Sequence, residues 1–277
     1  ILLGLVGSEM CIRDSYVTER TIEFIERHQR AQKPFFAWCS FPDPHHPMTP
    51  PGRFFYLYKP KDMPLPQSRH YSLYGAPAHL KQFAAIHPKD QRNWVAPCGY
   101  GSDELLAEAI AATYGMITMI DEGVGRIMQT LNQLGIEDNT LVVFTSDHGD
   151  MMGEHGLFLK GFMHYRGTLQ VPLLIRSPGQ LPGRTSALAT TLDLAPTLLD
   201  LAGLSTFDGM QGHSLEPCLD GERRVRSSVL IEDDLPEVTA SLTPMPARTR
   251  TLITPEYRYT VNSKGEQQLF NLGEDPD

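Results

Sequence analysis

Residues 140–161 (TLVVFTSDHGDMMGEHGLFLKG) constrain the fold more than any other part of the chain, because an apolar run ends there in a cluster of ligand-type side chains. The run at 141–144 is short, β-branched and aromatic, which is typical of a strand covered on both faces in a parallel sheet. Asp147 and His148 follow at the carboxyl end of this strand. Ligands of open α/β sheets bind just beyond the carboxyl ends of the strands, so this position predicts a metal or anion site.

The order of the expected elements predicts an α/β fold. Apolar residues recur at helical spacing from 103 to 134, with Gly135 as a C-cap. The other elements are helices at 17–30 (starting after Thr18) and 192–202 (closed by Gly203), and strands at 35–41, 140–146 and 171–176. A strand, a long excursion, a helix and another strand indicate a βαβ crossover, and therefore a mostly parallel sheet with helices on both faces.

Two regions differ from this pattern. Residues 42–101 are rich in proline, glycine and aromatic residues without a sustained period, so they predict a long excursion that walls the substrate pocket. After about residue 221 the chain changes to short mixed segments such as VLIED and YRYTVN. These segments predict a smaller antiparallel sheet.

Composition and charge narrow the function. The formal net charge of -9 argues against a nucleic-acid partner, which favours a basic face. The four cysteines have no CxxC spacing, so they indicate neither a zinc site nor a disulfide scaffold. The opening ILLGLVGSEMCIRDS lacks the basic start of a secretory signal and is too short to span a membrane.

Several motifs, in a consistent order, carry a family resemblance. TSDHGD and GEHG are followed by Lys160 and VPLLIR (171–176), and the flanking motifs are PFFAWCSFPDPHHPMTPP (34–51), DLAPTLLDLAG (193–203) and GHSLEPCLDGE (212–222). Together they resemble the sulfatases of the alkaline phosphatase-like superfamily. The resemblance implies that superfamily's α/β fold, with residues 16–220 as the C-terminal part of the catalytic domain and 221–277 as a truncated C-terminal subdomain.

Both ends of the chain resemble cut ends. Residues 1–15 resemble translated adapter sequence found at the ends of metagenomic reading frames, and we expect them to be non-native. The last residues, LFNLGEDPD, resemble a family segment that is normally followed by more protein. We therefore expect a fragment, and the family's habit favours export to the periplasm or beyond.

The resemblance implies roles for individual residues. Asp147 and His148 are the implied metal ligands of one divalent ion, for which the family implies Ca²⁺, although a histidine ligand also suits magnesium, manganese or zinc. Lys160 is implied to contact the sulfate and its bridging oxygen, where a fixed cation offsets charge on the leaving oxygen. His45, the first histidine of PHHP (44–47), matches the position that binds sulfate and protonates the leaving group, a task suited to an imidazole.

Three further histidines are candidates for substrate binding. His46 is the rival of His45, since either imidazole of this proline-bounded turn can point inward. His155 and His164 are expected to line the pocket. Arg166 stands where the family often has an acidic residue, which changes the contacts expected near His164.

The sequence contains no Cys/Ser-x-Pro-x-Arg segment, in which the family converts a cysteine or serine to formylglycine, the nucleophile. We expect formylglycine and two further carboxylate ligands upstream, and we expect this polypeptide alone to be inactive. The expected partner is a sulfated small molecule or polysaccharide, with no nucleic acid and no membrane span, and the oligomeric state is open. The alternatives are a phosphonate or phosphate ester hydrolase of the same superfamily and a noncatalytic anion- or carbohydrate-binding relative.

Overall fold

The computed structural model describes residues 2–90, 92–219, 224–236 and 245–275, with the backbone alone for residues 2–13. The chain forms two compact units. Unit 1 comprises Ile1–Tyr71, Ala84–Thr140 and Met152–Leu159, and unit 2 comprises Ser72–Phe83, Leu141–Met151 and Lys160–Asp277. The domain boundary expected between residues 220 and 221 stays a prediction.

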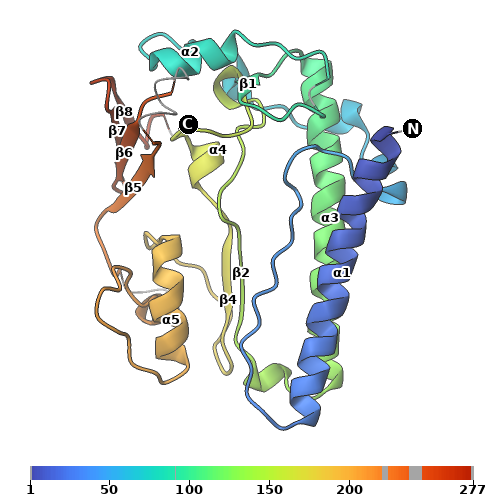
Figure 1. Ribbon diagram of the computed structural model, residues 1–277. Coiled ribbons are helices and arrows are strands. Elements are labelled where there is room, and N and C mark those ends of the chain that lie inside the picture. Colours follow the sequence, from blue (N-terminus) through green and yellow to red (C-terminus); the bar gives the residue numbers. More distant parts are fainter. Residues whose placement is uncertain (1, 91, 220–223, 237–244, 276–277) are drawn as a thin grey trace. The chain divides into compact units, whose positions relative to one another are not determined.

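Two long helices form the frame of unit 1. Helices α1 (Leu2–Arg30) and α3 (Asp103–Gln133) lie side by side (Figure 1). Helix α3 confirms the predicted helix: the Ser102 hydroxyl accepts a hydrogen bond from the Leu105 N–H as an N-cap, and Gly135 has a φ of 66° just past the end. A Cβ at Gly123 would lie 2.7 Å from the Thr18 hydroxyl, so this glycine lets the helices approach closely.

The expected start of the first helix after Thr18 is wrong. Helix α1 spans Leu2–Arg30, and the Thr18 hydroxyl donates to the Asp14 carbonyl (3.0 Å), four residues earlier. A threonine that bonds backward in this way lies inside a helix, whereas an N-cap bonds forward to the next turn.

The excursion at 42–101 is largely irregular, as expected, but part of it belongs to the core of unit 1. Met48 and Cys98 are fully buried and pack with Leu106 and Met116 of α3 and with Phe158. The regular elements of the excursion are η1 (Gly52–Tyr56), η2 (Pro60–Asp62), η3 (Gln67–His70), α2 (Ala78–Ala84) and β1 (Cys98–Gly99). Strand β1 pairs antiparallel with β3 (Leu157–Phe158), which anchors the end of the excursion.

The strand expected at 35–41 is not found in the described part of the chain. This segment pairs with no described strand, and the side chains of Phe36 and Trp38 are 69% and 74% exposed. A strand needs a neighbour for its backbone groups, and an apolar run alone does not supply one.

The two other expected strands are present in unit 2, but their pairing differs from the expectation. β2 (Val142–Thr145) pairs antiparallel with β4 (Leu173–Arg176), in the register Val142↔Arg176. The chain between them turns back on itself through α4 (Arg166–Leu169), so no parallel crossover joins these two strands. The crossover predicted from the sequence joins residues 35–41 to 140–146, and it is not found among the described residues because no strand is described at 35–41.

The predicted C-terminal antiparallel sheet is confirmed. Its order is β5 (Val229–Asp234), β6 (Arg248–Ile253), β7 (Tyr257–Asn262) and β8 (Gln267–Asn271). Thr249 and Thr251 of β6 point to its buried face, together with Thr260 of β7. This face is unusually polar, so its hydroxyls need hydrogen-bond partners.

The predicted helix at 192–202 is present as η6 (Thr191–Asp193) followed by α5 (Leu194–Leu201). Thr190 and Asp193 form a capping box, and Gly203 ends the helix with a φ of 69°. The short remaining elements are η4 (Glu137–Asn139), η5 (Glu154–Gly156) and η7 (Glu216–Cys218). Among the helices that the structure describes, none is long and apolar enough to cross a bilayer.

Candidate active site

The loop after β2 presents Asp147 and His148 where the sequence predicted them. The His148 N–H donates to Asp147 Oδ1 (2.9 Å), and the Ser146 hydroxyl donates to the His148 carbonyl (2.9 Å). His148 Nδ1 lies 3.0 Å from the Gly149 carbonyl, and His148 Nε2 lies 3.5 Å from Asp147 Oδ2. A carboxylate oxygen and an imidazole nitrogen thus lie side by side at the strand end.

Gly149 fixes this loop against a second part of unit 2. Its N–H donates to the Thr168 carbonyl (2.9 Å), and a Cβ at this position would lie 2.0 Å from the Gly167 carbonyl oxygen. Only glycine tolerates so close a backbone approach. The third residue of D-H-G is therefore explained by packing, and it joins the loop to the segment that follows Lys160.

Asp147 is suited to remain ionised. Partial desolvation raises its pKa, but the hydrogen bond from the His148 N–H and the charge of His148 outweigh that effect, so the pKa is lowered overall. The side chains of Asp147 and His148 are 84% and 40% exposed, so both are accessible to a ligand.

Asp147 and His148 are suited to supply two of the ligands of a divalent metal ion. If His148 Nδ1–H donates to the Gly149 carbonyl, Nε2 keeps its lone pair, which is the arrangement of metal-bound histidines. Adjacent ligands on Ca²⁺ are separated by roughly 3.3–3.7 Å given its usual bond lengths, and the observed separation is 3.5 Å. Among the described residues no third acidic, histidine or cysteine side chain joins them, so this part of the chain supplies two ligands only.

Lys160 begins the part of unit 2 that leads to α4. It is half-buried, and none of the ion pairs found among the described residues involves it. The neighbouring residues Leu159 and Phe162 have positive φ values of 66° and 52°. Non-glycine residues adopt such values where surrounding contacts hold them, so the lysine lies in a constrained loop.

His45 and His46 form the proline-bounded turn of unit 1. Their ring centroids are 3.9 Å apart, and His45 Nδ1 lies 2.7 Å from the His46 carbonyl. His45 is exposed and His46 is half-buried. The more open ring belongs to the residue that the sequence favoured, but the choice between the two stays a prediction.

A buried pair of carboxyl groups lies beside this turn. Burial raises the pKa of Asp43 to about 6, although its contact with Asp14 and the charge of His45 act in the opposite direction. Burial and repulsion from Asp43 raise the pKa of Asp14 to about 7. No sequence pattern predicted this pair, because the two residues are far apart in the chain.

The structure places His155 and His164 in buried surroundings. His155, in unit 1, is 6% exposed and meets the Tyr71 ring edge-on at 6.0 Å. His164, in unit 2, has both ring nitrogens within hydrogen-bond distance of side chains from the C-terminal sheet, Thr251 and Asp233. These contacts do not favour a direct substrate contact by His164, and the role of His155 stays a prediction.

The predicted site residues thus fall into two groups. Unit 2 contains Asp147, His148, Lys160 and His164, and unit 1 contains His45, His46 and His155. Sequence reasoning did not find Asp233 or Thr251, because no spacing signal links them to His164.

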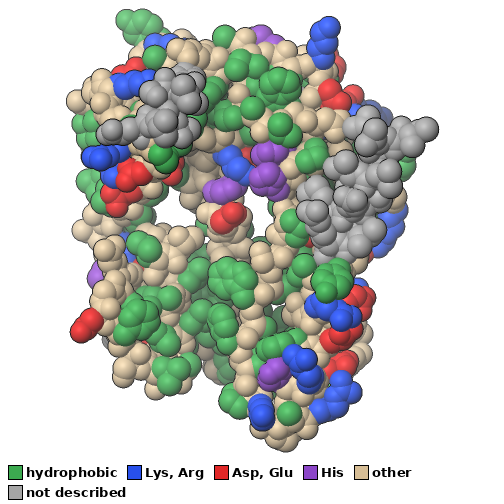
Figure 2. Space-filling view, in the orientation of Figure 1, with side chains coloured by type: hydrophobic (Ala, Val, Ile, Leu, Met, Phe, Trp, Pro, Cys, Tyr) green, Lys and Arg blue, Asp and Glu red, His purple; other side chains and the backbone are tan. Residues whose placement is uncertain are grey.

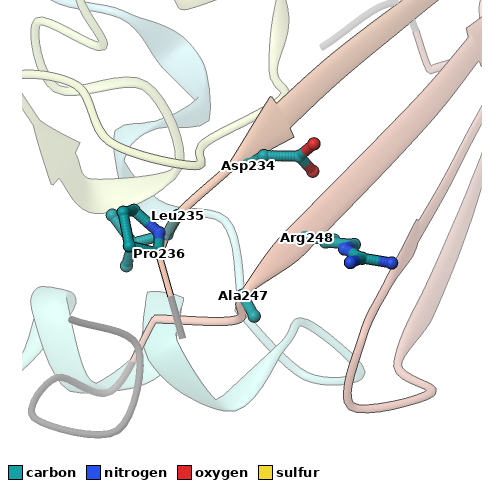
Figure 3. A pocket seen from close by; sticks show the side chains of 5 residues that line it. All are labelled: Asp234, Leu235, Pro236, Ala247 and Arg248. Atoms are coloured by element: carbon teal, nitrogen blue, oxygen red, sulfur yellow. The ribbon is translucent and has the colours of Figure 1, made fainter. Parts of the chain in front are cut away.

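A shallow hollow of about 420 Å³ lies at the end of β5 and β6 and contains none of the predicted site residues. Its lining residues are Asp234, Leu235, Pro236, Ala247 and Arg248. In Figure 3 the side chains of Asp234 and Arg248, which are register partners, point to the same side, away from Leu235 and Pro236. A hydrogen bond from Arg250 lowers the pKa of Asp234, so the carboxylate at this hollow already has a cationic partner.

The surface shown in Figure 2 carries basic side chains scattered among acidic ones. The net charge of -9 agrees with this distribution. Neither favours the broad basic face of a nucleic-acid-binding protein.

Comparison with known sequences decides the family. The profile of the family described as "Sulfatase" matches residues 9–204, which is more than half of the chain. This chain belongs to the sulfatase family. A second profile, described as "N-sulphoglucosamine sulphohydrolase, C-terminal", matches residues 153–276.

Individual relatives agree with this assignment. The sulfatase chain is 32% identical to an arylsulfatase of Clostridium perfringens, over 95% of this chain and 52% of the relative. It is also 32% identical to a choline-sulfatase of Rhizobium meliloti, over 91% and 46%. The chain therefore spans about half the length of the relatives that it matches.

A solved structure confirms the fold class. The phosphonate monoester hydrolase of Agrobacterium radiobacter superposes with a TM-score of 0.74 at 26% identity, over 95% of this chain and 55% of that one. The sulfatase chain thus has the alkaline phosphatase-like α/β fold expected from its motifs, completed by the antiparallel sheet at its C-terminal end.

Proposed function

We propose that the protein to which these residues belong is a sulfuric ester hydrolase, which cleaves R–O–SO₃⁻ with water to an alcohol and sulfate. The observation that carries the proposal is the pair of Asp147 Oδ2 and His148 Nε2, 3.5 Å apart at the end of β2. Gly149 holds this pair against the segment that follows Lys160. Membership of the sulfatase family supports the same reaction.

Each residue has a task in this reaction. Asp147 and His148 hold one divalent cation, for which we propose Ca²⁺, and a bound cation polarises a sulfate oxygen. Lys160 binds the sulfate and offsets the negative charge that grows on the bridging oxygen. His45 donates a proton to that oxygen, and since its Nδ1 faces the His46 carbonyl, Nε2 is the atom that delivers it.

The nucleophile is proposed to lie outside these 277 residues, as a formylglycine. The polypeptide alone therefore carries stabilising groups without a nucleophile, and we expect no turnover from it. Sulfate-ester hydrolysis by the purified 277-residue chain contradicts this expectation.

The central test uses the protein expressed with its upstream reading frame. Aryl sulfates and choline sulfate are the first substrates, chosen from the names of the two relatives. Lys160→Ala is expected to lower kcat/KM by about 10²- to 10³-fold. Lys33→Ala, which removes an exposed lysine just after α1 and outside the excursion, is the matched control and is expected to leave kcat/KM unchanged. Equal activity of the two variants, or no turnover by a formylglycine-containing protein, contradicts the proposal.

A second candidate is hydrolysis of phosphonate or phosphate esters, which the likeness to a phosphonate monoester hydrolase favours. Sulfate and phosphonate are both tetrahedral anions, and the same cation and lysine suit either one. The ratio of kcat/KM for an aryl sulfate to that for the matching phosphonate monoester separates the two. Binding of a sulfated saccharide in calorimetry without turnover of either ester identifies a noncatalytic relative.

A further inference from the structure

The loop that carries Lys160 is irregular in its backbone but deeply packed. Met163 and Tyr165 are 1% and 2% exposed, and Gly161 and Phe162 have φ values of 135° and 52°. Strained conformations of this kind persist only where neighbouring groups determine them. The contacts that hold residues 160–165 therefore decide where the lysine ammonium lies.

His164 makes the main polar contact between this loop and the C-terminal sheet. Its side chain is 3% exposed, with Nδ1 2.7 Å from the Thr251 hydroxyl of β6 and Nε2 2.9 Å from Asp233 Oδ2 of β5. Thr251 is fully buried, and its hydroxyl lies 2.7 Å from that of Thr260. We call His164, Asp233 and Thr251 the His164 clamp. Both ring nitrogens are used within the protein, so the imidazole acts as a bridge.

Adjacent residues of the loop are held as well. His79 Nε2 of α2 lies 3.2 Å from the Phe162 carbonyl, and Gln268 of β8 donates to the Tyr165 hydroxyl (3.0 Å). The guanidinium of Arg258 lies 5.4 Å from the centroid of the Tyr165 ring. All these groups belong to unit 2, so the loop and the sheet form one packed structure.

We propose that His164 is a positioning residue for Lys160, through which strands β5 and β6 set the place of the ammonium group. This inference rests on the proposed function, in which Lys160 contacts the ester. Four residues of free chain can span roughly 13 Å, whereas a catalytic group must be held within about 0.5 Å of its working position. The His164 clamp restricts this freedom of the chain on the C-terminal side of Lys160.

Thr251 supplies a matched set of variants. Thr251→Val removes the hydroxyl that faces His164 Nδ1 and keeps the shape, whereas Thr251→Ser keeps the hydroxyl. Thr249→Val is the control, because Thr249 lies on the same face of the same strand, is 2% exposed, and its hydroxyl has no hydrogen-bond partner among the described residues.

The first measurement is steady-state hydrolysis by the protein with its upstream reading frame. Thr251→Val is expected to lower kcat by about 10- to 100-fold with KM changed less than about threefold, since a displaced lysine mainly loses its contact with the transition state. Thr251→Ser and Thr249→Val are expected to stay within about threefold of the wild type in both constants. Equal kcat for Thr251→Val and Thr249→Val overturns the inference.

The second measurement does not depend on activity. Amide hydrogen exchange of residues 160–165 in the 277-residue chain is expected to be about tenfold faster in Thr251→Val, with α5 unchanged. If Thr251→Val does not fold, Asp233→Ala tests the same clamp, since the Asp233 side chain is 46% exposed and leaves the core intact. Unchanged exchange at 160–165 overturns the clamp. A wild-type protein that hydrolyses no ester, with faster exchange in the variant, overturns only the proposed function.

Discussion

Removing Arg226 should destabilise the protein far more than removing an exposed arginine. Arg226 donates two hydrogen bonds, of 2.6 and 2.5 Å, to the carboxylate of Asp193, whose side chain is fully buried. Arg226→Ala leaves that charge without its cation, which typically costs about 3–5 kcal/mol. The Thr190 and His213 N–H groups still donate to Asp193 at 2.8 Å each, so we expect the lower end of this range, about 3 kcal/mol.

Urea unfolding followed by far-UV circular dichroism measures this loss. Arg30→Ala is the control, since Arg30 forms an exposed i,i+4 pair with Glu26 and should cost no more than about 0.5 kcal/mol. A double-mutant cycle with Asp193→Ala should show a coupling energy of about 2 kcal/mol or more. A stabilising role for this ion pair is refuted if Arg226→Ala lowers the free energy of unfolding as little as Arg30→Ala does. It is refuted as well if the effects of Arg226→Ala and Asp193→Ala on that free energy are additive.

Three further predictions concern the remaining packing and charge. Gly125→Ala should stabilise α3 by about 0.5–1 kcal/mol in the same urea assay, because a Cβ there meets nothing within 4 Å, and a loss of stability contradicts this. Gly212→Ala should destabilise strongly, because its Cβ would lie 2.0 Å from the Leu192 carbonyl oxygen, and a neutral result contradicts the packing. Asp14 and Asp43 have raised pKa values of about 7 and about 6, so they stabilise the fold below pH 4 and lose that contribution as the pH rises through 6 and 7. Asp14→Asn should flatten this fall in a pH series of thermal unfolding, and an unchanged pH profile contradicts the assignment.

The elements that the sequence predicted correctly are those whose signals are local. Helix α3 has its N-cap at Ser102, a sustained apolar period and Gly135 just past its end. The helical segment at 191–201 likewise begins with the capping box of Thr190 and Asp193 and ends before Gly203. In these cases the signals come from residues within one or two turns of each other. The local sequence therefore predicts the element without knowledge of the fold.

The failures concern partners that lie far away in the sequence. Residues 35–41 have the composition of a strand, but composition does not say which strand would pair with them. The start of α1 was misplaced because a threonine hydroxyl such as that of Thr18 can bond forward as a cap or backward inside a helix. In both cases the deciding contact is absent from the local pattern.

The candidate site shows the same division. The sequence places Asp147 and His148 just beyond a strand, and β2 indeed ends at Thr145, while their role as metal ligands stays a prediction. The partners of His164 are 87 and 69 residues away, at Thr251 and Asp233, and no periodicity links such positions. The local sequence therefore predicts where these two side chains lie, whereas the contacts of His164 are visible only in the fold.

The two loops of unit 2 that carry the proposed chemistry are fixed by different means. The loop of Asp147 is held by a close backbone contact at Gly149. This contact leaves no space for a side chain, so position 149 accepts only glycine. The Lys160 loop is held by side chains from the C-terminal sheet, so its position depends on residues that lie outside every motif of the site. Residues 167 and 168 complete the connection, because they follow the lysine loop and their backbone carbonyls contact Gly149. The positions proposed for the cation and for the lysine are thus connected by one close backbone contact and one buried polar network.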